Sequence, residues 1–285
     1  GGESSLPKLN EKYYSYECYI LKHEKDGFRI DCEKVFDSES YKNDKLKELN
    51  ELLNKDYTIY ENTKTNDTYQ NLINTVLDIK NNMPTTIEEI EKSITKIKNA
   101  ISSLVDVVLV DIKLSSNNDT YTLNSNMKTL TVTALYNDTT KNKVLTSNDY
   151  TVNKKFDSKT IGNKSITYSY QNKQAIYNYV VEYSNAQLQS KVNSIEATLK
   201  EKISLKKTEY KIIFSNLQND VSIKNINVTK NNKVLKTIKL TKVSHDTYSM
   251  NRDDYFTLVN NNTTISNKKI NITYKIGNQE ITVSY

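Results

Sequence analysis

The pattern of apolar positions is most regular between residues 87 and 104. A large apolar residue recurs there with spacings of 3, 4, 3, 4 and 3, at Ile87, Ile90, Ile94, Ile97, Ile101 and Leu104. The residues between them are mainly polar, which predicts a helix with one narrow apolar stripe. Isoleucine at nearly every a and d position of a heptad favours three or four strands over two. We therefore predict a helix that associates with copies of itself. The alternative is a stripe that packs inside one chain.

The start of this helix is marked by Met83 and Pro84. Proline removes an amide donor and pushes the preceding residue out of helical geometry. Thr86 and Glu89 then form a T-x-x-E capping box. The sequence leaves open whether the helices of residues 44–104 continue as one stalk or fold back at Pro84.

Helical spacing also occurs on both sides of this segment. Upstream, residues 44–55 and 69–83 carry apolar residues three and four positions apart. Downstream, a polar segment that starts near Ser184 carries a second stripe, at Leu188, Val192, Ile195 and Leu199. We therefore predict a helical coiled-coil region over residues 41–104 and a short helical connector or coil over residues 184–205.

Residues 1–40 predict a separate β-hairpin that serves for attachment. Apolar residues alternate with polar ones before and after a turn at residues 25–27. With a loop at residues 23–27, Ile20 lies opposite Ile30, and Cys18 lies opposite Cys32. This geometry allows a disulfide between the two cysteines, and two buried free thiols are the alternative. The hairpin either docks onto a larger assembly or caps the coil.

From residue 105 the pattern changes to short alternating segments. They are found at residues 109–112, 129–136, 150–152, 165–170 and 176–181. Clusters rich in Asn, Asp and Ser separate them, and such clusters are turn signals. Short strands at this spacing predict an antiparallel β-sandwich over residues 105–183. Residues 206–285 have the same pattern and predict a second sandwich.

The two predicted sandwiches contain an internal repeat with an offset of 104 or 105 residues. Its corresponding pairs are 149–150 with 254–255, 161–164 with 265–268, and 166–170 with 270–274. Within the first sandwich, residues 130–138 (LTVTALYND), 145–152 (LTSNDYTV) and 161–170 (IGNKSITYSY) resemble the bacterial immunoglobulin-like domain. The second sandwich keeps the closing part of this pattern, with Ser266 in place of Gly162. The resemblance implies an extracellular or virion-surface β-sandwich that acts as a spacer or binding module, and it does not imply catalysis or any particular functional residue.

Composition narrows the class of protein. Only 36% of the 285 residues are hydrophobic, no Trp is present, and 38 of the 40 basic residues are Lys. This bias is typical of a low-GC genome, such as that of a Gram-positive bacterium or its phage. The net charge of +6 is expected to be spread along the chain, and arginine is nearly absent, so no nucleic-acid partner is predicted. No apolar run is long enough to span a bilayer. Because the chain opens with Gly1 and Gly2 rather than Met, secretion stays open.

Catalytic chemistry is not expected from the motifs. His23 and His245 are the only histidines, and neither has a Cys or His neighbour at metal-ligand spacing. No phosphate loop or nucleophile elbow occurs, so we predict no catalytic residue, no metal and no cofactor. Exposed tyrosines suit glycan or protein ligands. The candidate ligand-facing residues are Tyr168, Tyr170, Tyr177 and Tyr179. The alternative is that these tyrosines fill a sandwich core.

Together these patterns predict an elongated α+β multi-domain protein in which coiled-coil segments alternate with Ig-like antiparallel β-sandwiches. We predict a non-enzymatic attachment protein, foremost a homotrimeric virion fibre or baseplate component that resembles those of phages. Its partners would be itself, other virion proteins and a host-surface glycan or protein. The alternatives are a monomeric surface adhesin or wall-associated spacer of a Gram-positive bacterium, and a non-catalytic region of a wall hydrolase.

Overall fold

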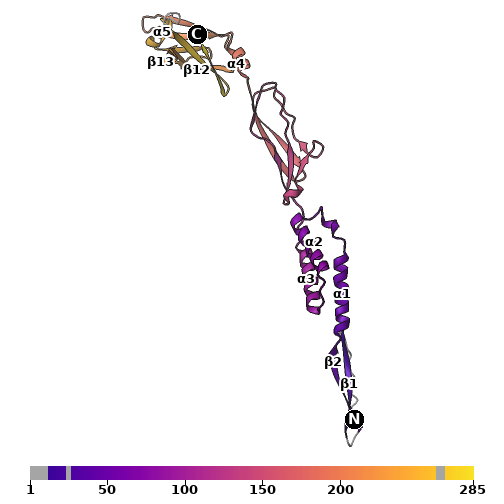
Figure 1. The fold of residues 1–285 in the computed structure, drawn as a ribbon. Coiled ribbons are helices and arrows are strands. Elements are labelled where there is room, and N and C mark those ends of the chain that lie inside the picture. Colours follow the sequence, from indigo (N-terminus) through magenta and orange to yellow (C-terminus); the bar gives the residue numbers. More distant parts are fainter. Residues whose placement is uncertain (1–11, 24–26, 261–266) are drawn as a thin grey trace. The chain divides into compact units, whose positions relative to one another are not determined.

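The computed structural model describes residues 12–23, 27–260 and 267–285 (Figure 1). The chain divides into two compact units. The first unit holds the residues up to Lys113 together with Val132–Leu145, and the second holds Leu114–Thr131 and Thr146–Tyr285. Each unit is described by itself.

The first unit begins with an antiparallel hairpin of β1 (Tyr14–His23) and β2 (Gly27–Phe36). Its register places Ile20 opposite Ile30 and Cys18 opposite Cys32, as the alternation predicts. The structure joins Cys18 to Cys32 by a disulfide. At the base of the hairpin, the backbone N–H of Asp37 donates to the carbonyl oxygen of Tyr13 over 2.6 Å.

Three helices follow: α1 (Ser38–Asn54), α2 (Asn66–Asn81) and α3 (Ile87–Ser102), with a short 3₁₀ helix at Thr58–Tyr60. Thr86 caps α3, because its side-chain oxygen accepts the backbone N–H of Glu89. Pro84 lies in the five-residue turn between α2 and α3, so these two helices fold back on each other (Figure 1).

The three helices form a bundle with a core of its own. The core residues are Leu49, Leu53, Tyr57, Leu72, Val76, Ile79, Ile90, Ile94, Ile97 and Ala100. Side-chain hydrogen bonds also join α1 to α3: the Tyr41 hydroxyl donates to Glu91 over 2.6 Å, and Lys98 donates to Glu48 over 2.8 Å. Both pairs are 50 residues apart, so α1 and α3 run in the same direction.

The bundle corrects the prediction of a seam between chains. Ile90 and Ile97 are fully buried and Ile94 is 5% exposed, all within one chain. Ile87, Ile101 and Leu104 are half-buried. A spacing of three and four residues suits helix packing within a chain as well as between chains. The stripe is real, but α1 and α2 cover it.

The first unit also contains a three-stranded sheet of β3 (Leu109–Leu114), β5 (Val132–Tyr136) and β6 (Lys143–Leu145), in the order β3-β5-β6. The turn after β5 is hydrogen-bonded to the start of α2 and to the segment after α3. Asn137 donates to the carbonyl of Asp106 and accepts from the N–H of Val108. Asp138 accepts the N–H of Asn66 over 2.7 Å. This amide is the first of α2 and has no partner inside the helix, so Asp138 acts as its cap.

The second unit begins with a four-stranded sheet in the order β4-β9-β8-β7. Its strands are β4 (Asp119–Thr122), β7 (Thr151–Val152), β8 (Gly162–Tyr170) and β9 (Lys173–Glu182). β7, β8 and β9 pair antiparallel, whereas β4 pairs with β9 in parallel. The sheet therefore departs from the purely antiparallel arrangement that the sequence predicts.

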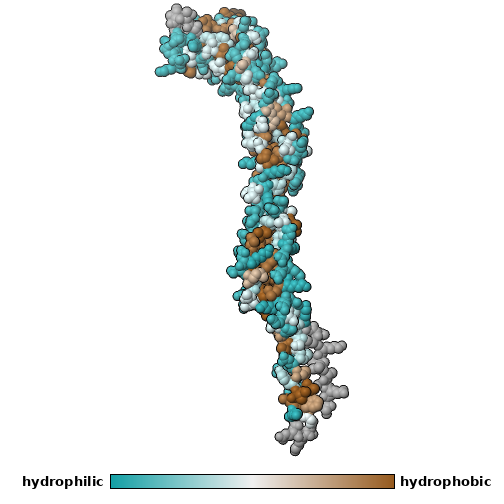
Figure 2. All heavy atoms as spheres, turned by 45° about the vertical axis from the view of Figure 1, so that its right-hand side comes forward, coloured by the Kyte–Doolittle hydropathy of each residue, from teal (hydrophilic) through white to brown (hydrophobic). Residues whose placement is uncertain are grey.

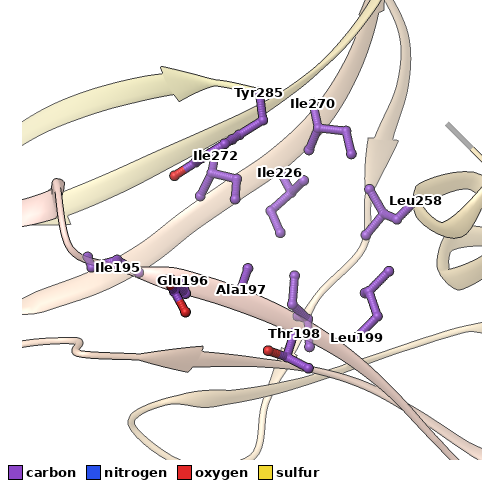
Figure 3. Close-up of a pocket in the computed structure, with 11 residues that line it drawn as sticks. Ile195, Glu196, Ala197, Thr198, Leu199, Ile226, Leu258, Ile270, Ile272 and Tyr285 are labelled. Atoms are coloured by element: carbon purple, nitrogen blue, oxygen red, sulfur yellow. The ribbon is translucent and has the colours of Figure 1, made fainter. Parts of the chain in front are cut away.

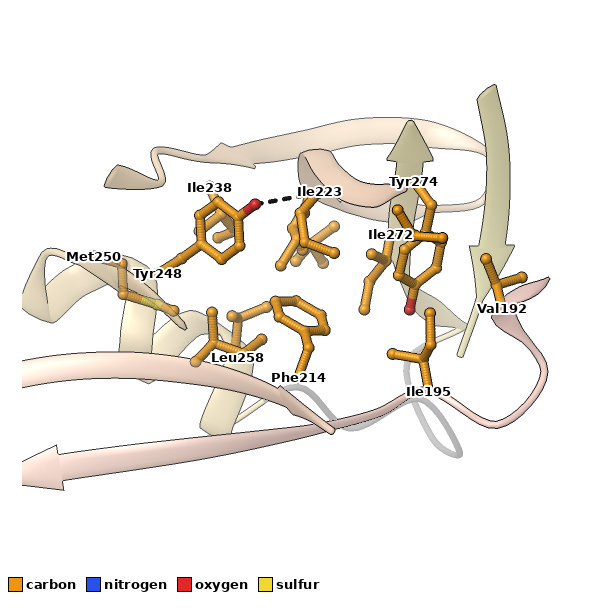
Figure 4. Close-up of a cluster of buried hydrophobic side chains, with 14 of the residues drawn as sticks. Val192, Ile195, Phe214, Ile223, Ile238, Tyr248, Met250, Leu258, Ile272 and Tyr274 are labelled. Atoms are coloured by element: carbon orange, nitrogen blue, oxygen red, sulfur yellow. Dashed lines mark hydrogen bonds between the residues drawn. The ribbon is translucent and has the colours of Figure 1, made fainter. Parts of the chain in front are cut away.

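The C-terminal part of this unit is a domain with two four-stranded sheets, ordered β10-β11-β15-β14 and β13-β12-β16-β17. Their bounds are β10 (Glu196–Lys202), β11 (Glu209–Ser215), β12 (Val221–Lys230), β13 (Lys233–Ile238), β14 (Thr241–Lys242), β15 (Thr247–Met250), β16 (Lys268–Ile276) and β17 (Gln279–Ser284). Helices α4 (Asn185–Val192) and α5 (Arg252–Val259) complete it. One apolar core joins strands of both sheets, and Phe214, Tyr248 and Tyr274 lie within it (Figure 4).

Two predictions for this region are wrong. Residues 184–205 do not form a helical connector, because α4 ends at Val192 and β10 begins at Glu196. Leu188, Val192, Ile195 and the half-buried Leu199 pack into the C-terminal core instead of a second seam.

The internal repeat holds for the strands β8 and β16. Asp254 and Tyr255, however, lie in α5, whereas their counterparts in the first sandwich precede β7. Ser266 lies outside the described residues.

Candidate functional site

An open apolar groove of about 480 Å³ lies along the inner side of β10 (Figure 3). Its lining is Ile195, Glu196, Ala197, Thr198, Leu199, Ile212, Ile226, Leu258, Ile270, Ile272 and Tyr285. In Figure 3, residues of β10 form one wall, and Ile270, Ile272 and Tyr285 form the opposite wall. The groove therefore opens between the edge strand of one sheet and the facing sheet.

The groove exists because a small residue stands on the inward face of an edge strand. Ala197 lies opposite Phe214, and Leu199 lies opposite Ile212, so the two β10 residues share the inward face of their partners. A methyl group at position 197 cannot fill the space that a larger residue would occupy. Since β10 has a neighbour on one side only, nothing on its other side closes the opening among the described residues.

The floor of the groove is formed by buried core residues. Ile226 and Ile272 are at most 3% exposed and belong to the C-terminal core. Deeper in that core, the hydroxyl of Tyr248 accepts the N–H of Ile223 over 3.2 Å, the bond that is dashed in Figure 4. Buried polar groups with partners fix a packing arrangement. The floor of the groove is therefore part of the packed core of the domain.

The chemistry of the groove is that of an apolar binding site. Its polar side chains are Glu196, Thr198 and Tyr285, and no histidine, cysteine or lysine lines it. The Tyr285 hydroxyl lies 3.3 Å from the hydroxyl of Tyr274, whose pKa is raised by burial and by this contact. The described residues also contain no group of His, Cys, Asp and Glu that could hold a metal ion. An aliphatic or aromatic group fits the groove.

The tyrosines predicted to face a ligand point mostly inward. Tyr177 is fully buried, Tyr168 and Tyr179 are also buried, and Tyr170 is half-buried. The prediction of a ligand-facing row is therefore wrong, and the alternative of a tyrosine-filled core is the better description. Alternation fixes which residues share a face of a strand, but it does not say which face is inward.

The buried hydroxyls of these tyrosines have partners. Tyr177 donates to Asp119 over 2.6 Å, and the hydroxyls of Tyr121 and Tyr177 lie 2.6 Å apart. Lys128 and Ser116 also donate to Asp119, each over 2.8 Å. The Lys128 and Tyr177 hydrogen bonds lower the pKa of Asp119 to about 2. This network joins β4 to β9 and stabilises the sheet.

The charge distribution also differs from the expected even spread. Residues 195–285 contain 15 basic and 8 acidic residues, whereas residues 1–194 contain 25 and 26. The positive net charge therefore belongs to the C-terminal domain. Within it, Lys230 stands directly opposite both Lys233 and Lys268. Like charges directly opposite each other cost stability in a sheet.

The groove is not predicted by the sequence pattern. Its β10 wall lies in the segment that was predicted to be helical. Ala197 also carries no signal by itself, because a groove arises only from its position opposite Phe214. Among the described residues, no helix is both long and apolar enough to cross a membrane.

Comparison with known proteins supports the Ig-like resemblance. Residues 124–181 match the model of the bacterial Ig-like domain (group 3). No curated protein matches the chain. Residues 124–181 run from the loop after β4 to the penultimate residue of β9, and they include the motifs found in the sequence. An Ig-like domain is therefore confirmed for this segment.

Two solved structures are similar to the chain. One is described as "surface layer protein SbsC, domains 4-9", with 14% identity and a TM-score of 0.21, and the match covers 64% of this chain and 32% of that one. The other is described as "S-layer protein SbsC, domains 5-6", with 15% identity and a TM-score of 0.20, covering 62% and 96%. The chain thus spans about a third of the length of the first of these structures.

Proposed function

We propose that this chain is a non-enzymatic structural protein of a bacterial cell surface, in which Ig-like and helical domains act as spacers and binding modules. The observation that carries the proposal is the bacterial Ig-like match at residues 124–181. The apolar groove beside β10 supports a binding role for the C-terminal domain, because it offers shape and apolar area without reactive groups.

The monomeric surface protein is preferred to the trimeric virion fibre. The fibre hypothesis depended on an isoleucine seam between chains, and Ile90, Ile94 and Ile97 are buried within one chain. The bundle and the C-terminal domain each have an apolar core of their own. A series of independently packed domains suits a spacer that holds a binding module away from the cell wall.

Localisation tests this proposal. An antibody against the C-terminal domain is applied to intact cells of the source bacterium and, separately, to purified virions released from the same culture. Labelling of intact cells, lost after brief protease treatment of the cell surface, is the expected result. Labelling of virions with unlabelled cells would overturn the proposal in favour of the fibre.

The role of the groove is tested separately. Ala197→Leu places a larger side chain into the groove, and Thr241→Leu puts the same side chain at an exposed position of β14 that does not line the groove. We expect the first substitution to reduce binding of the isolated chain to a cell-wall preparation, and the second to leave it unchanged. Equal binding by both variants would remove the groove from the proposal.

A further inference from the structure

The N-terminal hairpin exposes large apolar side chains that no described part of the chain covers. Strand register assigns five opposed pairs to one face, which we call face A: Tyr14–Phe36, Tyr16–Lys34, Cys18–Cys32, Ile20–Ile30 and Lys22–Phe28. Ile20 is 69% exposed, Phe28 is 66% exposed and Ile30 is 52% exposed. Figure 2 shows apolar atoms gathered on the hairpin. A two-stranded sheet in water is marginally stable, and the described residues leave the apolar face of this one open.

The opposite face of the hairpin, face B, is acidic but also partly apolar. Its opposed pairs are Ser15–Val35, Glu17–Glu33, Tyr19–Asp31 and Leu21–Arg29. Glu17 and Glu33 stand directly opposite each other, an arrangement that costs stability unless a cation lies nearby. The Tyr19 pKa is raised by its hydrogen bond to Glu17 and by the charges of Glu17 and Glu33. Tyr19 and Leu21 add exposed apolar area to this face.

The two faces complement each other in charge and in polarity. Face A carries Lys22 and Lys34 among its apolar residues, whereas face B carries the opposed glutamates among its own. All four charged side chains are exposed. Lys34 also lies over the Tyr14 ring, 4.5 Å from its centroid. Stacking face A of one hairpin on face B of another, about 10 Å apart as in packed sheets, would bring one of the lysines to the opposed glutamates and cover apolar residues of both faces.

We infer that the hairpin binds a second copy of this chain, with face A of one hairpin stacked on face B of the next. Because the two faces differ, the contact is heterologous and can add further copies. At ~200 Å² per large side chain, the exposed fractions of Tyr14, Ile20, Phe28, Ile30 and Phe36 amount to about 500 Å² on face A. Covering this area and a similar one on face B buries roughly 1,000 Å², near the lower limit of specific interfaces.

This inference does not depend on where the chain is localised. It also differs from the trimeric seam, because the contact lies on the hairpin and leaves the helical bundle intact. An interface of this size predicts weak, salt-sensitive association, since its ion pairs are exposed to solvent.

The test is sedimentation equilibrium of the full chain over a hundredfold concentration range. The wild-type weight-average mass is expected to rise above 32.9 kDa with concentration and to fall back when salt is added. Glu17→Lys/Glu33→Lys makes both faces basic, and Lys22→Glu/Lys34→Glu makes both acidic. Each double variant should stay monomeric, whereas an equimolar mixture of the two should associate again, because opposite charges then meet at every contact.

The control is Glu51→Lys/Glu201→Lys, which changes two exposed glutamates away from the hairpin by the same charge. This variant should associate like the wild type. Helical circular dichroism should be unchanged in all variants, because none of these residues lies in the bundle core.

Two results would overturn the inference. The first is a wild-type chain that stays monomeric throughout. The second is association that persists in both double variants. The result that specifically supports stacking of face A on face B is association in the mixture while each double variant alone stays monomeric.

Discussion

The helical bundle and the N-terminal hairpin both carry regular apolar patterns, but only the bundle covers its own. Ile90 and Ile97 on α3 are fully buried against α1 and α2. Ile20 and Phe28 on the hairpin are more than 60% exposed. A regular apolar pattern therefore does not show whether the chain covers the face that carries it. Three helices can enclose a stripe, whereas two strands alone have only one layer.

The largest expected effect is a loss of stability of the helical bundle. Ile97→Ala removes a fully buried side chain and leaves a cavity, so we expect the free energy of unfolding to fall by about 2–5 kcal/mol. Urea denaturation followed by helical circular dichroism measures it. The matched control is Ile59→Ala, because Ile59 is 61% exposed, and it should change stability by less than ~0.5 kcal/mol. Equal losses would contradict the internal core.

The next effect concerns the hairpin, whose stability we expect to rest on its disulfide. Cys18→Ser/Cys32→Ser opens a loop between residues 14 positions apart, and such a loop contributes about 3 kcal/mol. We expect hydrogen exchange of the hairpin amides to lose protection, while the urea midpoint of the bundle stays the same. A matching loss in the bundle would show that the two regions unfold together.

A smaller effect tests a cap that the bundle receives from the turn after β5. Asp138→Ala removes the acceptor of the Asn66 N–H at the start of α2 and should cost about 1–2 kcal/mol. Glu51→Ala, an exposed change on α1, is the control and should be close to neutral. Unfolding of the bundle is the measurement. No difference between the variants would mean that α2 does not need this cap.

The smallest effect concerns the base of the hairpin. Hydrogen bonds from Tyr13 and from Lys12 lower the pKa of Asp44. A lowered folded-state pKa means that the interaction stabilises above the ordinary value of about 4 and is lost as the pH falls through the folded value. As the pH falls from about 4 through the folded-state pKa of Asp44, we expect the hydrogen-exchange rate of the Asp37 amide, corrected for intrinsic exchange, to rise in the wild type. In Asp44→Asn the corrected rate should be flat across this pH range.

Sequence reasoning could predict elements and register, but not the partner of each face. The α3 stripe and the Cys18–Cys32 register follow from local spacing, which a single segment contains. The error at Ile195 and Leu199 has a simple cause: residues four apart share a face in a helix and also in a strand. Which side of β8 and β9 turns inward depends on residues far away in the chain, and so does the groove beside Ala197.

The most direct test of the account is the concentration dependence of the thermal melting of the helices. It is measured by circular dichroism on the Glu17→Lys/Glu33→Lys chain, in which hairpin association is removed. If the isoleucine stripe is covered within one chain, the midpoint temperature should be the same over a hundredfold range of protein concentration. A midpoint that rises with concentration would show that the stripe joins separate chains, and it would contradict the internal bundle.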